Sequence, residues 1–432
     1  GAIQLGTGSK LLVTSSTTFS ANNAGTDGGA IACHTCDSIV MNSGTLFSFN
    51  TAGESGGAMS VVNPVSKTTL SSNSTFRENK AETGNGGAVH VLDSGSAGEW
   101  TSSGDTFEKN VAISGSGGAI ATFGTAVTLE SDSSCKNNKA PKGGGGCMLW
   151  ESNAINIADD KWKRFTPIIS NTELVQNNEA GYGASLATPG ASLRIVDTNA
   201  MTTGSDNILN PRYPTVELLD WYGAVVLGAF AAGVDVDAKF SGESDANLFG
   251  AITARVVDTT GTASFTELGV QGTPTSGPHQ LFFESFLTVS NSNGERHLND
   301  TTHYLETYVK GCDDKFFLGD TSKQCEQCPV NSELKSGYVK GTAQTVCLCN
   351  PDYFRQTNNK GIMSCTKCHA RSTSPSNSTS IEQCTCDLGL FQEETTTNEK
   401  VVRDCNACPV NSILKSGFVK GTAQTVCICN PN

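Results

Sequence analysis

Long apolar runs, positive charge and aromatic residues are all scarce in this sequence of 432 residues. No apolar stretch reaches the roughly 20 residues that a membrane-spanning helix needs. The nearest candidate, residues 224–233, is short and leads into Asp235 and Asp237, so we interpret it as part of a sheet core. The 29 basic against 42 acidic residues give a formal charge of −13, which argues against nucleic acid or an anionic membrane as a partner.

Aromatic residues make up 7% of the chain and charged residues 16%, whereas glycine occurs 46 times. This balance is typical of repetitive β-proteins with many turns and small surface residues. The length is sufficient for two to four domains. The first residue is glycine and no signal sequence follows it, so we expect a mature, processed or partial product.

A two-part phrase recurs along the first 185 residues. It combines Phe-x-x-Asn, as at 107–110, with Gly-Gly-Ala and an apolar residue, as at 117–120. The glycine pairs start at positions 28, 56, 86, 117 and 145, so they are 28, 30, 31 and 28 residues apart, and this period indicates a solenoid. β-Branched and alternating runs beside each phrase favour strands. The sequence therefore predicts an all-β chain in which residues 1–205 form a right-handed parallel β-helix.

Equivalent side chains of a parallel β-helix stack about 4.8 Å apart. We therefore predict an internal ladder of phenylalanines and a polar ladder of asparagines at a turn, because asparagine tolerates left-handed backbone and can bond the neighbouring coil. The ladder residues are Phe19, Phe47, Phe76, Phe107, Asn22, Asn50, Asn79 and Asn110. An insertion at 150–170 lengthens one period to about 40 residues. We expect it to bulge from the coils as a variable loop, with a binding loop as the alternative.

The paired motifs resemble the repeats of the polymorphic outer-membrane proteins, whose passenger regions are β-helical and adhesive. The resemblance covers residues 1 to about 190 and is carried by four intact copies in register. It implies the fold. It implies little about function, since solenoids occur in enzymes, adhesins and inert spacers alike.

Short strand-like runs separated by Gly, Pro and Asp replace the repeated phrase after residue 206. They lie at 215–219, 224–230, 251–257, 262–268 and 280–289. This spacing favours a β-sandwich over residues 206–310. Segments 216–223 and 261–265 resemble immunoglobulin-like modules of bacterial surface proteins. An irregular continuation of the solenoid is the alternative.

Cysteine is concentrated at the C-terminal end, where thirteen of the 17 cysteines follow residue 311. Cys-x2-Cys and Cys-x-Cys pairs alternate there with a period of 40 residues. Residues 328–351 and 408–431 differ at only three positions, which indicates a tandem duplication. The pattern resembles the cysteine-rich, growth-factor-like (EGF-like) repeats of ephrin receptors. The resemblance implies disulfide-stapled extracellular modules over residues 311–432.

We expect the cysteines to form disulfides in an oxidising, extracellular or cell-surface compartment. They are Cys33, Cys36, Cys135, Cys147, Cys312, Cys325, Cys328, Cys347, Cys349, Cys365, Cys368, Cys384, Cys386, Cys405, Cys408, Cys427 and Cys429. Pairing in sequential order from Cys312 is one possible map, and crossed pairing within each unit is its rival. The sequential map leaves Cys429 to a cysteine beyond Asn432 and so predicts that the repeats continue.

Two further cysteine pairs lie in the solenoid region. Cys135 replaces a ladder phenylalanine and Cys147 a corner alanine, so a bridge between them is plausible. Cys33 and Cys36 flank His34, and either a local disulfide or two thiols is favoured over a zinc site there. The C-terminal Cys-x2-Cys pairs are also zinc-like, but their alternation with Cys-x-Cys favours disulfides.

Three acceptor sequons for N-glycosylation agree with a secreted protein. They begin at Asn73, Asn299 and Asn377. We expect Asn377 to be the best acceptor, because Ser-Pro-Ser precedes it in an evident loop.

Groups of residues that could form a catalytic site are sparse in this sequence. A polysaccharide-active β-helix enzyme needs carboxylate clusters for acid–base work or for calcium. The only adjacent acids of the solenoid region, Asp159 and Asp160, lie beside basic residues in the insertion, and the six histidines are scattered. We therefore predict no enzyme, no catalytic residues, no cofactor and no metal, and keep a polysaccharide-active enzyme as a minor alternative.

These patterns predict an extracellular structural protein. A solenoid has two ends with unpaired strand groups that must be capped or paired, and pairing with another copy or a companion chain gives a filament unless it closes. Our first hypothesis is a subunit of a cell-surface or flagellar filament, such as a hair or mastigoneme, or of a cell-wall layer. The alternative is a cell-surface adhesin or receptor ectodomain that binds a glycan or protein. Contact with a membrane would then require a segment outside this sequence.

Overall fold

The computed structural model describes most of the chain. The described residues are 1–14, 16–42, 44–64, 68–94, 98–130, 132–154, 160–170, 175–204, 207–209, 212–242, 246–289, 294–300, 303–397 and 400–430. They are almost entirely β, with 4% helix. They fall into two compact units, residues 1–270 with 278–307 and residues 271–277 with 308–432. The expected three-domain division at 205/206 and 310/311 stays a prediction.

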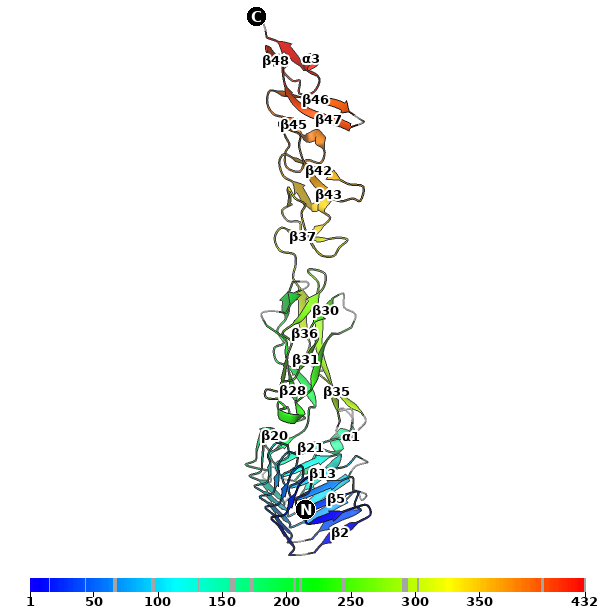
Figure 1. The fold of residues 1–432 in the computed structure, drawn as a ribbon, viewed down its shortest axis with the longest axis vertical. Helices are drawn as coiled ribbons and strands as arrows, with labels where there is room; N and C mark the ends of the chain where they lie inside the picture. Colours follow the sequence, from blue (N-terminus) through cyan, green and yellow to red (C-terminus); the bar gives the residue numbers. More distant parts are fainter. Residues whose placement is uncertain are drawn as a thin grey trace. The chain divides into compact units, whose positions relative to one another are not determined.

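The first part of unit 1 is a parallel β-helix of about five turns, built from four parallel sheets (Figure 1). The first sheet has the order β1 (Ile3–Leu5), β5 (Ile31–His34), β9 (Met59–Val62), β13 (Val89–Leu92), β17 (Ile120–Phe123), β21 (Met148–Glu151) and β24 (Leu186–Ala187). The second has β2 (Lys10–Val13), β6 (Ser38–Met41), β10 (Thr68–Ser72), β14 (Gly98–Ser103), β18 (Thr125–Leu129) and β22 (Ile168–Ile169).

The third sheet has β3 (Thr18–Ser20), β7 (Leu46–Ser48), β11 (Thr75–Arg77), β15 (Thr106–Glu108) and β19 (Ser134–Lys136). The fourth has β4 (Asn23–Ala24), β8 (Thr51–Ala52), β12 (Lys80–Ala81), β16 (Val111–Ala112), β20 (Lys139–Gly144) and β23 (Glu179–Tyr182). Each strand therefore pairs with the strand one repeat earlier and one repeat later. The predicted parallel β-helix is confirmed.

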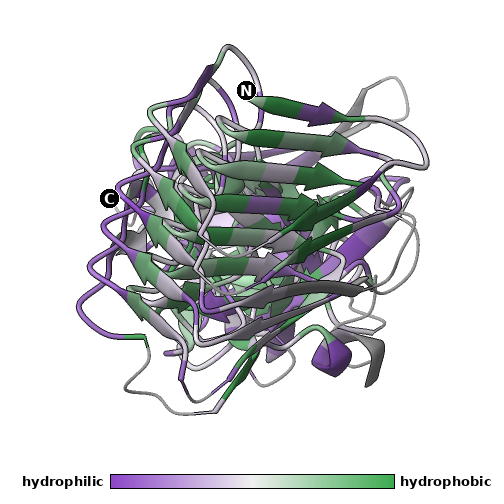
Figure 2. Ribbon diagram, turned by 90° about the horizontal axis from the view of Figure 1, so that it is seen from below, coloured by the Kyte–Doolittle hydropathy of each residue, from purple (hydrophilic) through white to green (hydrophobic). Residues whose placement is uncertain are grey.

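The interior of the solenoid is filled by apolar side chains that recur from coil to coil. Figure 2 shows the stacked strands with hydrophobic segments repeated along the stack. Phe19, Phe47, Phe76 and Phe107 form the predicted internal stack, with ring centroids 4.9, 4.7 and 4.8 Å apart and nearly parallel planes. These spacings equal the distance between paired strands. The register of the third sheet places the phenylalanines opposite one another, so the sequence period becomes a continuous apolar column.

The glycine pairs form corners where two coils approach too closely for a side chain. Gly86 has a positive φ of 70°, a backbone conformation that glycine adopts without steric cost. A Cβ on Gly87 would lie 2.1 Å from the carbonyl oxygen of Gly118 in the next coil. The first glycine is therefore required by the backbone conformation and the second by the contact between coils.

The insertion at 150–170 carries buried aromatic residues, which were not predicted from the sequence, and the expected bulge from the coils stays a prediction. Trp150, Trp162 and Phe165 are buried together in a second apolar cluster. Trp162 lies in the short helix α1 (Asp160–Arg164), and its ring centroid is 5.6 Å from that of Trp150. The physical reason is the two large indoles, which need an apolar environment. Asp159 lies outside the described residues.

Antiparallel sheets follow the last coil within unit 1. One has the order β25 (Ser192–Ile195), β28 (Thr215–Leu219) and β32 (Thr262–Ser264). The next has β26 (Met201–Thr203), β36 (Leu305–Val309), β34 (His279–Thr288), β29 (Asp235–Phe240) and β31 (Thr253–Arg255), with β35 (Glu295–Asn299) also paired to β34. The third has β27 (Asn207–Ile208), β33 (Leu268–Gln271) and β30 (Asn247–Gly250).

The antiparallel pairing argues against an irregular continuation of the solenoid over this region. The strands expected at 215–219 and 280–289 are present as β28 and β34. The strand expected at 224–230 is absent, and our prediction was wrong there. Val225 makes only an isolated bridge, and a 3-10 turn, η2 (Gly228–Phe230), follows. Gly228, with a φ of 71°, turns the chain out of the extended conformation. The resemblance to immunoglobulin-like modules stays a prediction.

Unit 2 is a series of two- and three-stranded sheets. Its three-stranded sheet has β37 (Phe316–Gly319) paired with β38 (Cys325–Gln327) and β40 (Lys340–Gly341). Two two-stranded sheets combine β39 (Ser332–Leu334) with β41 (Cys347–Cys349) and β42 (Tyr353–Thr357) with β43 (Met363–Lys367). Three more combine β44 (Ser372–Thr373) with β45 (Thr385–Cys386), β46 (Leu390–Thr397) with β47 (Lys400–Ala407), and β48 (Ser412–Leu414) with β49 (Cys427–Cys429). The short helices are α2 (Ala343–Val346), η3 (Ile381–Gln383) and α3 (Ala423–Val426). The duplicated segments fold alike, because α2 and α3 both begin with a Thr capping box, at Thr342 and at Thr422.

Candidate functional site

The disulfides of unit 2 follow the sequential map. The pairs are Cys312–Cys325, Cys328–Cys347, Cys349–Cys365, Cys368–Cys384, Cys386–Cys405 and Cys408–Cys427. Crossed pairing within a unit is therefore excluded in this structure. Cys429, the counterpart of Cys349 and Cys386, is an exposed thiol, and its pairing with a cysteine beyond Asn432 stays a prediction.

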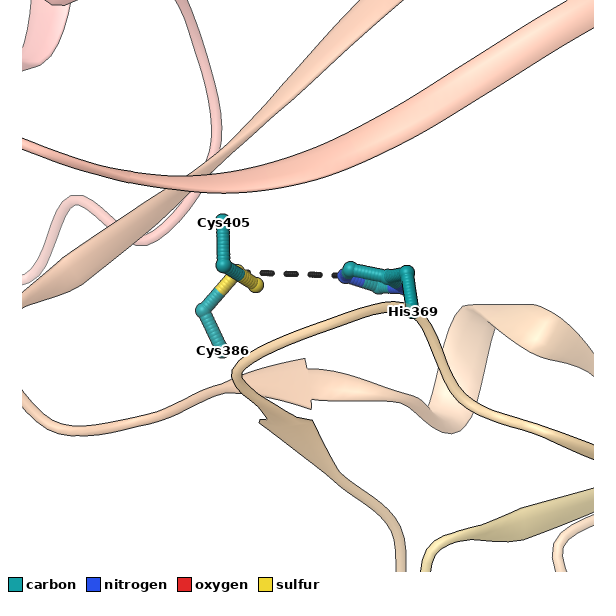
Figure 3. Close-up of side chains that lie close together, drawn as sticks. All are labelled: His369, Cys386 and Cys405. Atoms are coloured by element: carbon teal, nitrogen blue, oxygen red, sulfur yellow. Dashed lines mark hydrogen bonds between the residues drawn. A yellow bond between two sulfur atoms is a disulfide. The ribbon is translucent and has the colours of Figure 1, made fainter.

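One group of possible metal ligands stands out in the described part of the chain. His369, Cys386 and Cys405 offer ligand atoms that lie within 4.8 Å of one another (Figure 3). The two sulfurs, however, are joined in a disulfide, and a soft metal ion is bound by thiolates. The Nε2 atom of His369 lies 4.0 Å from the Sγ atom of Cys386, and burial together with the nearby Arg403 lowers the pKa of His369. A neutral imidazole against a disulfide is a packing arrangement rather than a metal centre.

The sequence shows why an imidazole can occupy this place. In each 40-residue repeat of the cysteine-rich region, the residue that directly follows the Cys-x2-Cys pair has a ring. It is Pro329 in the first repeat, His369 in the second and Pro409 in the third. A ring at this position is thus common to the three units. The pattern favours a structural role for His369.

The solenoid holds the other two disulfides. Cys33 is bonded to Cys36, so the two-thiol and zinc alternatives for that pair do not describe this structure. Cys135 is bonded to Cys147. Both are buried in the solenoid core, where Cys135 continues the phenylalanine column opposite Phe107 in the strand register. The column of phenylalanines therefore ends at Phe107, and the next coil has this disulfide at the equivalent position.

Removing the Cys135–Cys147 bridge should destabilise the solenoid. A serine at both positions should lower the free energy of unfolding by about 2 to 4 kcal/mol, because the bridge closes a short loop and restricts the unfolded chain. Changing Cys135 to Phe and Cys147 to Ala instead restores the residues that the other coils have at these positions, and should recover a large part of that loss. Chemical denaturation of both variants measures this, and equal losses would contradict the assignment of Cys135 to the phenylalanine column.

The asparagines form a hydrogen-bonded ladder along the stacking direction. The Nδ2 atom of Asn50 donates to the Oδ1 atom of Asn79 at 2.9 Å, and that of Asn79 donates to Asn110 at 3.0 Å. The backbone N–H of Asn50 also donates to the Oδ1 atom of Asn79. The ladder begins with Asn22 and continues to Asn138 and Asn178. Each amide thus satisfies buried polar groups of neighbouring coils, as predicted from the Asn positions.

A second polar ladder precedes the glycine pairs and was not predicted. Its residues are Asp27, Ser55, Asn85 and Ser116. The backbone N–H of Ser55 donates to Asp27, that of Asn85 to Ser55, and that of Ser116 to the Oδ1 atom of Asn85. The signal was present in the sequence, because a small polar residue stands directly before the first glycine in each of these four repeats.

A third polar ladder contains a buried carboxyl group. Asp105 lies directly before the third-sheet strand, at the place that Thr45, Ser74 and Ser133 occupy in other coils. Its Oδ1 atom accepts the backbone N–H of Ser74 at 2.7 Å, and its Oδ2 atom accepts the hydroxyl of Ser102 at 2.8 Å. Burial raises its pKa to about 6, because these hydrogen bonds only partly replace the lost water.

The solenoid should therefore become less stable as the pH rises from about 4 to about 6. The folded-state pKa of Asp105 lies above the unfolded value of 3.8, so protonation favours the folded state and ionisation opposes it. The shift of about two pKa units corresponds to about 3 kcal/mol. Asp105→Asn should remove this pH dependence and raise stability at pH 7 by about 2 kcal/mol. Urea midpoints at pH 4 to 7 measure the effect.

The exposed Glu54 provides the control for the Asp105 variant. Glu54→Gln removes one negative charge from the same solenoid without changing a buried group. It should leave the pH profile of the urea midpoint as it is in the unaltered chain. A profile that Asp105→Asn does not flatten would contradict the assignment to Asp105.

The structure places two of the three sequon asparagines at the surface. Asn73 and Asn377 are exposed and both have a positive φ, which is typical of turns. Asn377 is contacted by Arg355, whose Nη2 atom donates to its Oδ1 atom at 3.3 Å. Asn299 is half-buried at the end of β35, and the third residue of its sequon lies outside the described residues. The structure does not test glycosylation itself, which stays a prediction at all three positions.

The end of the solenoid is closed by a charged cluster that sequence reasoning missed. Arg296 of β35 is 1% exposed and Glu151 of β21 is 3% exposed, and the Nη2 atom of Arg296 lies 3.4 Å from Glu151 Oε1. The guanidinium also donates to the carbonyl oxygens of Gly190 and Ser152. It lies over the Trp162 ring, 4.2 Å from the ring centroid. This cluster joins the last coils to the antiparallel sheets.

No protein-family model, curated protein or solved structure matches this chain. The three family resemblances therefore rest on the sequence motifs and segments themselves. The structure supports the β-helical repeats and the disulfide-stapled modules that these resemblances imply. Among the described residues, the helices are too short and too polar to cross a membrane. The eight disulfides indicate an oxidising environment, such as that of a secreted or extracellular protein.

Proposed function

We propose that this protein is an extracellular structural protein, a subunit of a cell-surface or flagellar filament, such as a hair or mastigoneme, or of a cell-wall layer. The observation that carries the proposal is the continuity of bonding along the solenoid. Side-chain hydrogen bonds join Asn22 through Asn178 from coil to coil, beside the stacked phenylalanines. Such axial ladders resist bending and local opening, which is what a load-transmitting element requires.

The ends of the solenoid limit how such subunits can join. The last coil is followed directly by the antiparallel sheets, and Arg296 and Trp162 pack against it. This end is therefore covered, as solenoid ends commonly are. Subunits joined through the solenoid consequently use its first coil or its lateral faces rather than stacking both ends in series.

The cysteine-rich unit supports the same function. It is built from small modules, each closed by disulfides to its neighbours in sequence, as in Cys349–Cys365 and Cys386–Cys405. Modules with little buried core depend on such bridges for stability. A chain stabilised in this way suits long exposure to an extracellular medium.

A cell-surface adhesin or receptor ectodomain is the second candidate, and one feature favours it. Unit 2 contains an open groove of about 570 Å³ lined by Phe316, Tyr338 and Val339. Val339 is exposed, and the same turn recurs with Phe418 and Val419. Exposed aromatic and apolar side chains beside a groove are suited to binding a protein or glycan.

Electron microscopy distinguishes the two functions. Purified full-length chain should form polymers with a regular repeat, and antibodies against it should label surface filaments or a wall layer along their length. Dispersed single particles that bind immobilised glycan or protein through the groove would contradict the structural assignment. Tyr338→Ala should abolish such binding and leave polymers unchanged.

A further inference from the structure

One lateral face of the solenoid carries an aligned column of residues that begins with an exposed leucine. In β2, Leu12 is 61% exposed whereas its neighbour Val13 is 4% exposed, so the strand alternates between outside and core. The strand register aligns Leu12 with Val40, Val40 with Leu70, Leu70 with Thr101 and Thr101 with Thr128. We call this column, in β2, β6, β10, β14 and β18, the lateral column.

Two charged residues of opposite sign flank the lateral column, one at its first strand and one at its fourth. Lys10 stands two residues before Leu12 in the first strand of this sheet, and Glu99 stands two residues before Thr101 in the fourth strand. Both side chains are largely exposed. Each has one partner of opposite charge, Asp37 at 3.0 Å from Lys10 and Arg164 at 3.5 Å from Glu99. The positive side chain of Lys10 and the negative side chain of Glu99 are thus separated by the two intervening strands, β6 and β10.

This arrangement is complementary to itself. A two-fold axis parallel to the strands and midway between β6 and β10 would lay two such sheets face to face with the coil order reversed. Leu12 of one copy would then oppose Thr101 of the other, and Lys10 would oppose Glu99 in both halves of the interface. Facing sheets pack about 10 Å apart, and an isologous contact of this kind closes as a dimer.

The repeat distance also selects the partner. The features of the lateral column recur at the strand spacing, about 4.8 Å, and only a partner with the same repeat can match several coils in register. A second copy of this chain has that repeat. We propose that the lateral column is a homodimer interface between two antiparallel solenoids. The proposal rests on the proposed structural function and supplies one of its contacts, and a second contact outside this face has to join the closed dimers into a filament or layer.

Charge reversal tests the interface in the full chain. At concentrations below those at which polymers form, the unaltered protein should sediment as a dimer, whereas Lys10→Glu and Glu99→Lys should each raise the dimer dissociation constant at least about tenfold, since like charges then face each other twice. An equimolar mixture of the two variants should dimerise again. In the mixed dimer the introduced glutamate of one copy faces the introduced lysine of the other, and the two unaltered residues, Lys10 and Glu99, face each other as before. The double variant should dimerise alone for the same reason.

The control is a charge reversal on another sheet. Lys80 of β12 is half-exposed and also has an acidic partner, Glu82, so Lys80→Glu should leave the dimer unchanged. Thermal melting of each variant shows that it is folded. An unaltered protein that stays monomeric, or a mixture of single variants that does not associate, would overturn the proposal. Regular polymers that neither variant disturbs would overturn this interface and leave the structural function standing, whereas a chain that is always a monomer would remove both.

Discussion

Replacing Phe76 by alanine should lower the free energy of unfolding of the solenoid by about 3 to 5 kcal/mol. Phe76 is fully buried and stacks on Phe47 and Phe107, at centroid distances of 4.7 and 4.8 Å. The loss is the sum of two terms, the hydrophobic transfer free energy of the removed phenyl ring and the cost of the cavity left behind. The neighbouring rings cannot fill this cavity, because the strand register fixes their positions. Urea denaturation followed by far-ultraviolet circular dichroism measures the change.

Phe49 provides a matched control in the same solenoid. It is 50% exposed and lies in a turn with a positive φ of 54°. Phe49→Ala should therefore change stability by less than about 1 kcal/mol. If Phe76→Ala cost no more than Phe49→Ala, the apolar column would not be a main source of stability.

Replacing Arg296 by methionine should cost about 3 to 5 kcal/mol. The substitution keeps much of the apolar volume over Trp162 but takes the positive charge away from the buried carboxylate of Glu151. It also removes the donors to the carbonyl oxygens of Gly190 and Ser152. Hydrogen exchange should increase in β21 and β35 together, because the cluster joins these two strands.

A double-variant cycle separates the ion pair from packing. Glu151→Gln combined with Arg296→Met removes both charges, so the pair of changes should cost less than the sum of the single changes. Arg194→Met is the control, because Arg194 pairs with Glu217 at the surface and such pairs contribute at most about 1 kcal/mol. Additive losses at Arg296 and Glu151 would show that the two charges do not stabilise each other.

The solenoid was predictable because its information is local and repeated. A phenylalanine and an asparagine three residues apart, followed by two glycines, specify a strand, a turn and a corner. The constant period then places equivalent residues of successive repeats next to each other in neighbouring coils. Phe76 and Asn79 thus meet Phe107 and Asn110 without any further information. The sequential disulfide map was one of the two maps that the sequence left open, and it has a similar physical basis, since neighbours in sequence are neighbours in a chain of small modules.

The sheets after the last coil were less predictable, because their pairing partners lie far apart in sequence. β28 pairs with β25 and with β32, about 25 and 45 residues away, and nothing in the separate segments identifies these partners. The expected strand at 224–230 shows the same limit. Its residues suit a strand, but the turn at Gly228 and the bond of its N–H to Asp258 decide the conformation.

The sequence by itself determined the β-helix and its two predicted ladders, whereas it left the sequential and the crossed disulfide maps of the cysteine-rich region open, and the structure has the sequential one. Only the tertiary structure brought Arg296 to Glu151, 145 residues earlier, and buried Trp162 of the insertion beneath the guanidinium. A lone arginine between Glu295 and His297 carries no local sign of burial. It is buried because the last coil and β35 together exclude water around it, and that environment exists only once both have folded.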